Sequence, residues 1–147
     1  MRKQYITWVV VLDSQQARLF MKGANGNLES LGYPIYADPI RTNPDSRRSL
    51  GRAFSGGGNV RHIIELHTSE WTLERQEFVK RVVEHLEASL WEYDRLIIAA
   101  PPKILGFFRK ILSKPVQDKV ILELNKDFIR LQSQQIHNRL KSLINIF

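Results

Sequence analysis

The sequence predicts an α/β fold in which one mixed β-sheet carries helices on its faces. Three observations predict it: short β-type segments separated by turn residues near the N-terminus, a later continuous apolar run, and helical apolar stripes on either side of that run. The chain has 147 residues, of which 43% are hydrophobic. This size and composition predict a single domain over residues 1–147 with one sizeable core.

The first third of the chain predicts an antiparallel meander of three strands. Residues Thr7–Leu12 are β-branched and apolar, as in a central strand, and a second strand is expected over Ala17–Met21. The glycine- and asparagine-rich residues Gly23–Asn27 then predict a turn. A third strand is expected over Leu28–Tyr36, and the glycine and proline inside it favour an edge position or a bulge.

The second half predicts helices that alternate with strands. A long helix is expected over Glu70–Trp91, with Ser69 as its N-cap and one apolar stripe along its length. The continuous run Arg95–Ala100 is typical of a strand buried on both faces, and two prolines end it. A second helix is expected over Lys103–Leu112 and another strand over Val120–Leu124. A C-terminal helix is expected because apolar residues recur at helical spacing: Ile136, Leu140, Leu143, Ile144 and Phe147.

The order of these elements, β-β-β, loop, α, β, α, β, α, is also that of ribonuclease-H-like folds. A two-metal nuclease site would need carboxylates from the first strand and from the end of the buried strand. Asp13 ends the first strand, but the buried strand ends in Ala99–Pro102, and Asp94 lies at its opposite end. Asp13 is therefore predicted to cap backbone N–H groups of a turn. Because the four histidines lack zinc-motif spacing and there is no cysteine, we expect no metal and no cofactor.

The chain is strongly basic, and its formal net charge of +7 favours polyanionic partners such as nucleic acid, the ribosome or an anionic membrane surface. Much of this charge falls in a glycine-rich loop over residues 41–62, where five arginines against Asp45 give a net +4. Arginine binds phosphate through a planar fork, and glycines let backbone N–H groups approach a ligand closely. We expect this loop to be mobile in the free protein, because it holds few apolar anchors. A solvated loop without a ligand is the alternative; otherwise the residues expected to contact RNA are Arg41, Arg47, Arg48, Arg52, Arg61 and His62.

A second basic stretch over residues 103–119 also carries five cations against one acid, Asp118, for a net +4. Its expected RNA contacts are Lys103, Arg109 and Lys110, although charged helices are often only solvated faces. The N-terminal apolar run is too short for a secretory segment or a membrane span, and the absence of cysteine suits a reducing compartment. We therefore expect a cytoplasmic protein without a membrane span, whose partner is the ribosome or tRNA and whose oligomeric state stays open.

A series of short motifs spans nearly the whole chain: Trp8–Asp13, Ala17–Phe20, Gly51–Arg52, Gly56–Asn59, Arg61–His62, Glu77–Phe78, Arg95–Pro102, Leu105–Gly106 with Arg109, and Lys126–Phe128. In their order and spacing they resemble the host attachment protein family. That family is in turn similar to the central domain of the archaeal and eukaryotic class-one peptide-chain release factors and of the ribosome-rescue protein Pelota. The resemblance implies the same α/β topology for this chain.

In the release factors, the loop before the long helix carries Gly-Arg-Gly-Gly-Gln, enters the peptidyl-transferase centre and positions the water that cleaves peptidyl-tRNA. Here Gly51–Arg52 and then Gly57, Gly58 and Asn59 lie in the corresponding loop, with four extra residues between the two parts. The resemblance implies that Asn59 would position the water and that the two glycines would shape the site. Asparagine replaces the family's glutamine, so peptidyl-tRNA hydrolysis is left open. The alternative is a non-catalytic interaction or regulatory protein that affects bacterial attachment to host cells.

Overall fold

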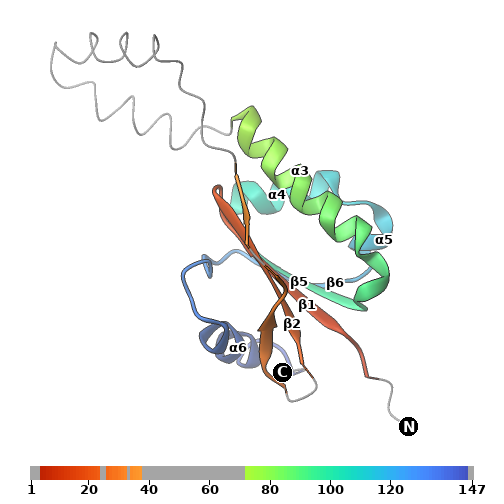
Figure 1. Ribbon diagram of the computed structural model, residues 1–147, viewed down its shortest axis with the longest axis vertical. Helices are drawn as coiled ribbons and strands as arrows, with labels where there is room; N and C mark the ends of the chain where they lie inside the picture. The colour runs from red at the N-terminus through yellow and green to blue at the C-terminus, as the bar shows by residue number, and fades with distance from the viewer. Residues whose placement is uncertain (1–3, 24–25, 33, 38–71, 146–147) are drawn as a thin grey trace, which may run out of the picture.

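The computed structural model describes residues 4–23, 26–32, 34–37 and 72–145 (Figure 1). Their strands form one sheet of order β3-β2-β1-β5-β6, with β4 also paired to β2. The strands are β1 (Thr7–Leu12), β2 (Gln16–Lys22), β3 (Leu28–Ser30), β4 (Ile35–Tyr36), β5 (Arg95–Ala99) and β6 (Val120–Leu124). Strand β1 runs antiparallel to β2 and parallel to β5, and β5 runs parallel to β6. The predicted mixed sheet is thus confirmed.

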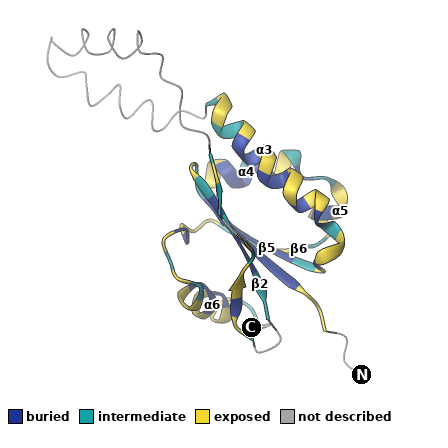
Figure 2. Cartoon of the chain, viewed as in Figure 1, coloured by how far each residue is buried: buried dark blue, intermediate teal, exposed yellow. Residues whose placement is uncertain are grey.

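Helices cover both faces of this sheet (Figure 1). On one face lie α3 (Leu73–Ala88), α4 (Pro102–Ile111) and the short α5 (Lys114–Gln117), and on the other lies α6 (Ser133–Lys141). A single 3₁₀ turn, η1 (Leu90–Glu92), links α3 to the chain that enters β5. Figure 2 shows that the buried residues gather on the strands and on the inner faces of the helices.

The alternation of side chains along β1 supplies both halves of the core. Trp8, Val10 and Leu12 pack with α3 and α4, whereas Val9 and Val11 pack with α6. Strand β5 alternates in the same way, because its even-numbered residues join the first cluster and its odd-numbered residues the second. A strand between two helical layers needs apolar side chains at every position, which explains its continuous apolar run.

The expected third strand is instead two short strands. Strands β3 and β4 both pair with β2, at different parts of its length. Between them Gly32 has a φ of +74°, a left-handed conformation that residues with side chains rarely adopt. The predicted edge position is correct for β3, which ends the strand order, but the predicted continuity was wrong.

The boundaries of α3 and α6 also differ from the sequence prediction. Thr72 caps α3, since its hydroxyl accepts a hydrogen bond from the Arg75 N–H (3.3 Å), whereas the predicted cap Ser69 lies outside the described residues. Helix α3 ends at Ala88, three residues before the predicted Trp91. Helix α6 ends at Lys141, so Leu143 is 54% exposed and takes no part in a buried stripe. The four-residue α5 was missed because it is too short for a periodic signal.

The predicted role of Asp13 is confirmed. Its Oδ1 accepts hydrogen bonds from the N–H groups of Gln15 (2.8 Å) and Gln16 (2.9 Å), which closes the turn between β1 and β2. His137 packs in α6 with only 9% of its surface exposed.

The Arg18 side chain ties β2 to the connection between β6 and α6. Its Nη1 donates hydrogen bonds to the carbonyl oxygens of Ile129 (2.9 Å) and Leu131 (2.6 Å). The guanidinium also lies 4.8 Å from the centre of the Phe20 ring. These bonds hold the connection over the α6 face of the sheet, where Phe128 is buried.

We predict that Arg18→Met lowers the free energy of unfolding by about 1.5–3 kcal/mol, because two charge-assisted hydrogen bonds are lost while the apolar stem is kept. Chemical denaturation measures the loss, and amide hydrogen exchange should accelerate first at Leu131. Arg130→Ala removes an exposed cation from the same connection and should leave stability within about 0.5 kcal/mol of the wild type. Equal effects of the two variants would contradict the assigned role.

Tyr93 contacts both the C-terminal part of α3 and Trp8 of β1. Its hydroxyl donates a hydrogen bond to the Leu86 carbonyl oxygen (2.8 Å), and its ring lies 4.9 Å from that of Trp8. Burial, with a smaller contribution from the nearby Glu87 carboxylate, raises the pKa of Tyr93 from 10.0 to about 12. The fold therefore favours the neutral phenol.

We predict that the stabilisation from Tyr93 is fully present below pH 10 and is lost as pH rises from 10 toward 12, since the unfolded chain releases this proton first. At pH 8, Tyr93→Phe should be about 1 kcal/mol less stable than the wild type, through the lost hydrogen bond. By about pH 11 the difference should vanish or reverse. Urea denaturation at several pH values tests this, and a pH-independent gap would contradict it.

Candidate nucleic-acid interface

The carboxyl ends of the parallel strands meet at one edge of the sheet, called here the carboxyl edge. It is formed by the residues that follow β1, β5 and β6, beginning with Asp13, Ala100 and Asn125. Strand β4 ends there too, because Tyr36 pairs with Gln16 at the start of β2. In open α/β sheets, ligands bind in the crevice outside the carboxyl ends of the strands. The carboxyl edge is therefore the candidate ligand-binding edge of the sheet.

Two exposed lysines follow neighbouring strands at the carboxyl edge. Helix α4 starts directly after β5, with Pro102 in its first turn, so Lys103 stands at the helix N-terminus. Lys126 lies two residues beyond the end of β6, and the Ala100 N–H donates to the Leu124 carbonyl (3.0 Å) to join the two strand ends. Unpaired N–H groups in the first turn of a helix add partial positive charge. Together these groups suit phosphate oxygens.

Lys126 was not predicted as a site residue. The sequence contained a signal for it, because Lys126 comes two residues after one predicted strand. Lys103 comes three residues after another predicted strand. The signal becomes informative only when β5 and β6 are known to be parallel neighbours. Its neighbour Asp127 is exposed, and Asp127 Oδ1 accepts a hydrogen bond from the Ile129 N–H (3.2 Å).

Most of the predicted site residues lie in the segment 38–71, outside the described residues. They are Arg41, Arg47, Arg48, Arg52, Gly57, Gly58, Asn59, Arg61 and His62, and the predicted mobility of the loop also falls there. The residues on either side of the segment are described. The Ala37 N–H donates to the Gln15 carbonyl (2.7 Å) at the carboxyl edge, and α3 begins at the same end of the sheet (Figure 1).

The remaining predicted contacts lie farther along α4. Arg109 is six residues beyond Lys103, or about 9 Å along the helix. Its Nε and Nη2 both lie 2.6 Å from Glu123 Oε2 on β6, so much of its charge is compensated. Lys110 is exposed on the same turn. Lys103 therefore lies in the first turn of α4, and the two later cations lie in its last turn.

Lys119, which contributed to the second basic stretch, is part of the scaffold. Its Nζ donates to the carbonyl oxygens of Leu90 and Tyr93, the latter at 2.7 Å, and lies 5.0 Å from the centre of the Tyr93 ring. These bonds satisfy backbone acceptors around η1. The net +4 counted over residues 103–119 is therefore not one continuous surface.

Two further observations bear on the class of site. In the part of the chain that the structure describes, no three His, Asp or Glu side chains converge in a way that could hold a metal ion. None of the helices over the same residues is long and apolar enough to cross a membrane.

The solved structures that this chain matches include those of three proteins. S. cerevisiae Dom34, a translation termination-like factor involved in RNA quality control pathways, matches 94% of this chain with 12% identity and a TM-score of 0.46. The Thermoplasma acidophilum Pelota protein matches 97% with 16% identity and a TM-score of 0.44. The Aquifex aeolicus Ppx/GppA phosphatase matches 82% with 13% identity and a TM-score of 0.42. This chain spans 33%, 39% and 35% of those three chains, respectively.

Sequence comparison gives a nearer relative. The chain is 34% identical over 136 residues to the uncharacterized protein RP470 of Rickettsia prowazekii (strain Madrid E), and the match covers 83% of each chain. The family model described as "Protein required for attachment to host cells" matches residues 8–140, from the first strand into the last helix. This chain therefore belongs to the family of proteins required for attachment to host cells.

Proposed function

We propose that this protein is a cytoplasmic, release-factor-like domain that contacts tRNA or ribosomal RNA through its carboxyl edge and the arginine-rich segment 41–62. The observation that carries the proposal is the placement of charge. Lys103 and Lys126 stand at the ends of adjacent parallel strands, and both ends of the segment that holds five arginines join the described structure at the same edge. A phosphate backbone would meet several cations at once.

Structured RNA is the better target than single-stranded RNA. Single-strand binders stack successive bases on aromatic side chains, and the segment 41–62 offers only Phe54 for this purpose. Arginine side chains and helix N-termini instead contact phosphates. In folded RNA the phosphates lie at regular spacing along the backbone. The proposed contact therefore recognises shape and backbone rather than sequence.

Peptidyl-tRNA hydrolysis is the catalytic extension of this proposal. By resemblance to the release factors, Asn59 would position the attacking water, Gly57 and Gly58 would shape the loop, and Arg52 and Arg61 would hold phosphates. The amide of asparagine sits on a side chain one methylene shorter than that of glutamine. Because a misplacement of about 1 Å can reduce a rate roughly 100-fold, we expect any hydrolysis to be slow.

A second candidate follows from family membership. A protein required for attachment to host cells can act without catalysis, as an interaction or regulatory protein inside the cell. The two candidates differ in one measurable property. The RNA-contact proposal requires salt-dependent binding of tRNA or ribosomes, and the interaction proposal does not.

We predict that the wild type binds tRNA or ribosomes with an affinity that falls steeply as salt rises. Arg47→Ala, Arg48→Ala and Arg52→Ala combined should flatten the slope of log affinity against log salt by about one unit for each lost phosphate contact. Lys103→Ala with Lys126→Ala should flatten it by up to about two units. Filter binding or fluorescence anisotropy over a salt series measures both slopes.

The matched control is Arg139→Ala with Lys141→Ala, which removes two exposed cations from α6, away from the carboxyl edge. Its slope should change much less than that of the lysine pair. Equal slopes for the two double variants would show that only total charge matters. If the wild type binds neither tRNA nor ribosomes at low salt, the interaction candidate replaces the proposal.

For Asn59→Ala we predict nearly unchanged RNA affinity, because an amide makes no charge-assisted contact with phosphate. If the wild type releases peptide from peptidyl-tRNA on ribosomes, this variant should lose about 100-fold or more in rate. A single-turnover release assay beside the anisotropy assay separates the two effects. Equal release rates in variant and wild type would remove Asn59 from the proposed chemistry.

A further inference from the structure

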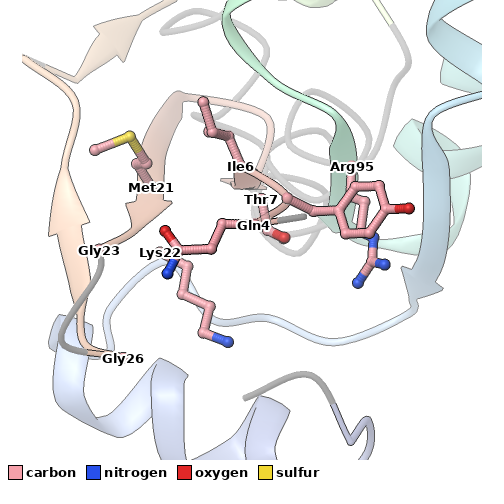
Figure 3. A pocket seen from close by; sticks show the side chains of 9 residues that line it. Gln4, Ile6, Thr7, Met21, Lys22, Gly23, Gly26 and Arg95 are labelled. Carbon is pink, nitrogen blue, oxygen red and sulfur yellow. The ribbon is translucent and has the colours of Figure 1, made fainter. Parts of the chain in front are cut away.

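An open cavity of about 620 Å³ lies beside the amino ends of β1 and β5, at the edge opposite the carboxyl edge (Figure 3). Its volume lies within the range of small-molecule sites in proteins, about 300–1,000 Å³. It is lined by the segment that enters β1, the end of β2 with its following turn, and the first residue of β5: Gln4, Tyr5, Ile6, Thr7, Met21, Lys22, Gly23, Gly26 and Arg95.

The sheet register places two cations on either side of β1. Arg95 pairs with Thr7 across the parallel ladder, and Met21 pairs with Trp8 across the antiparallel ladder, so Lys22 is the next residue opposite Thr7. Two strand spacings put the Lys22 and Arg95 backbones about 10 Å apart. By strand alternation both side chains project from the α6 face, and Figure 3 shows the two extending to the same side of the strands. Long side chains at this separation can reach one anion between them.

The Arg95 guanidinium is held in a defined orientation. It lies 3.9 Å from the centre of the Tyr5 ring, which is a stacking distance. Stacking occupies the face of the guanidinium and leaves the N–H groups at its edge directed outward in the plane, where a phosphate can accept two of them.

The wall that carries Tyr5 is fixed to the sheet by backbone bonds. The Ile6 N–H donates to Asp94 Oδ2 (2.8 Å), and the Ile6 carbonyl accepts from the N–H groups of Asp94 (2.8 Å) and Arg95 (3.1 Å). On the opposite wall, the Gly23 N–H donates to the Asn27 carbonyl (2.8 Å) and closes the turn after β2. The cavity is therefore built largely from anchored backbone.

The lining combines positive charge with exposed apolar surface. Among the described residues it holds two cations and no carboxylate; Asp94 lies outside the lining, and its Oδ2 bonds to Ile6. Tyr5 is 48% exposed. Bare phosphate would use only the cations, whereas a nucleotide would also cover the Tyr5 ring.

We propose that this cavity binds a nucleoside monophosphate unit, with its phosphate between Lys22 and Arg95 and its base against the exposed Tyr5 ring. The unit is either a free nucleotide or the 5′-phosphorylated end of an RNA. This site lies at the opposite edge of the sheet from the RNA contact proposed above, and it shares no residue with that contact. The two proposals can therefore be tested independently.

Isothermal titration calorimetry with adenosine 5′-monophosphate, adenosine and inorganic phosphate tests the assignment on the whole chain. The nucleotide should bind about tenfold or more tightly than either fragment, because only it uses both the cations and the Tyr5 ring. Amide chemical shifts of Thr7, Lys22 and Arg95 should change on titration. A nucleotide that binds no better than inorganic phosphate, or that shifts no signal in this cavity, overturns the proposal.

Variants locate the two halves of the ligand. Lys22→Ala should weaken nucleotide binding about tenfold, and Arg95→Lys should weaken it less, because lysine keeps the charge but loses the planar fork. Tyr5→Ala should reduce the preference for the nucleotide over phosphate. Lys80→Ala, which removes an exposed cation from α3 on the other face of the sheet, is the matched control. Equal loss in Lys22→Ala and Lys80→Ala overturns the proposal.

RNA oligonucleotides with and without a 5′-phosphate distinguish the two sources of the ligand. A preference of about tenfold for the phosphorylated end assigns the site to RNA ends. Equal, weak binding of both oligonucleotides beside tight nucleotide binding assigns it to the free nucleotide. Circular dichroism of each variant checks that the fold is intact before affinities are compared.

Discussion

Strand β1 is where the two halves of the fold meet, and every residue from Thr7 to Leu12 is buried. On one side it pairs antiparallel with β2, the start of the meander, and on the other it pairs parallel with β5. Its alternating side chains enter both cores, one under α3 and α4 and one under α6. A polar residue in place of any of the residues 8–12 would face one of two apolar layers without a partner, at a cost of several kcal/mol. The position of every other element follows from this strand.

Because β1 and β5 are parallel, the carboxyl and amino ends of the strands form two different edges of the sheet. At the carboxyl edge, parallel strands run into helices and loops, so Lys103 and Lys126 project beside a helix N-terminus. At the amino edge, the same ladder lines up Lys22, Thr7 and Arg95 across three strands beside a cavity. The first arrangement suits an extended phosphate backbone, and the second suits one small anion with an apolar part. The two proposed contacts therefore lie at opposite edges of one sheet and use different residues.

Several cations contribute to the scaffold rather than to a ligand surface. Arg18 and Lys119 each donate to two backbone carbonyls, and Arg109 pairs with Glu123. Such bonds hold connections that have few backbone partners of their own, and they explain why motif residues need not be site residues. Arg18 belongs to one of the motifs on which the family resemblance was based, yet its contacts are with the chain itself. Net charge over a stretch of sequence cannot separate these cations from those that face solvent, because the partners are distant along the chain.

The sequence by itself determined the class of fold, because burial on two faces requires a continuous apolar run and burial on one face requires a helical stripe. Strands β1, β5 and β6 and the role of Asp13 follow from such local patterns. Only the tertiary structure decided where elements end: Gly32 divides the third strand, and Leu143 lies beyond α6 although its spacing fits the stripe. It also decided which cations meet. Lys22 and Arg95 are far apart in sequence and become neighbours through pairing with β1, a long-range contact that no local pattern encodes.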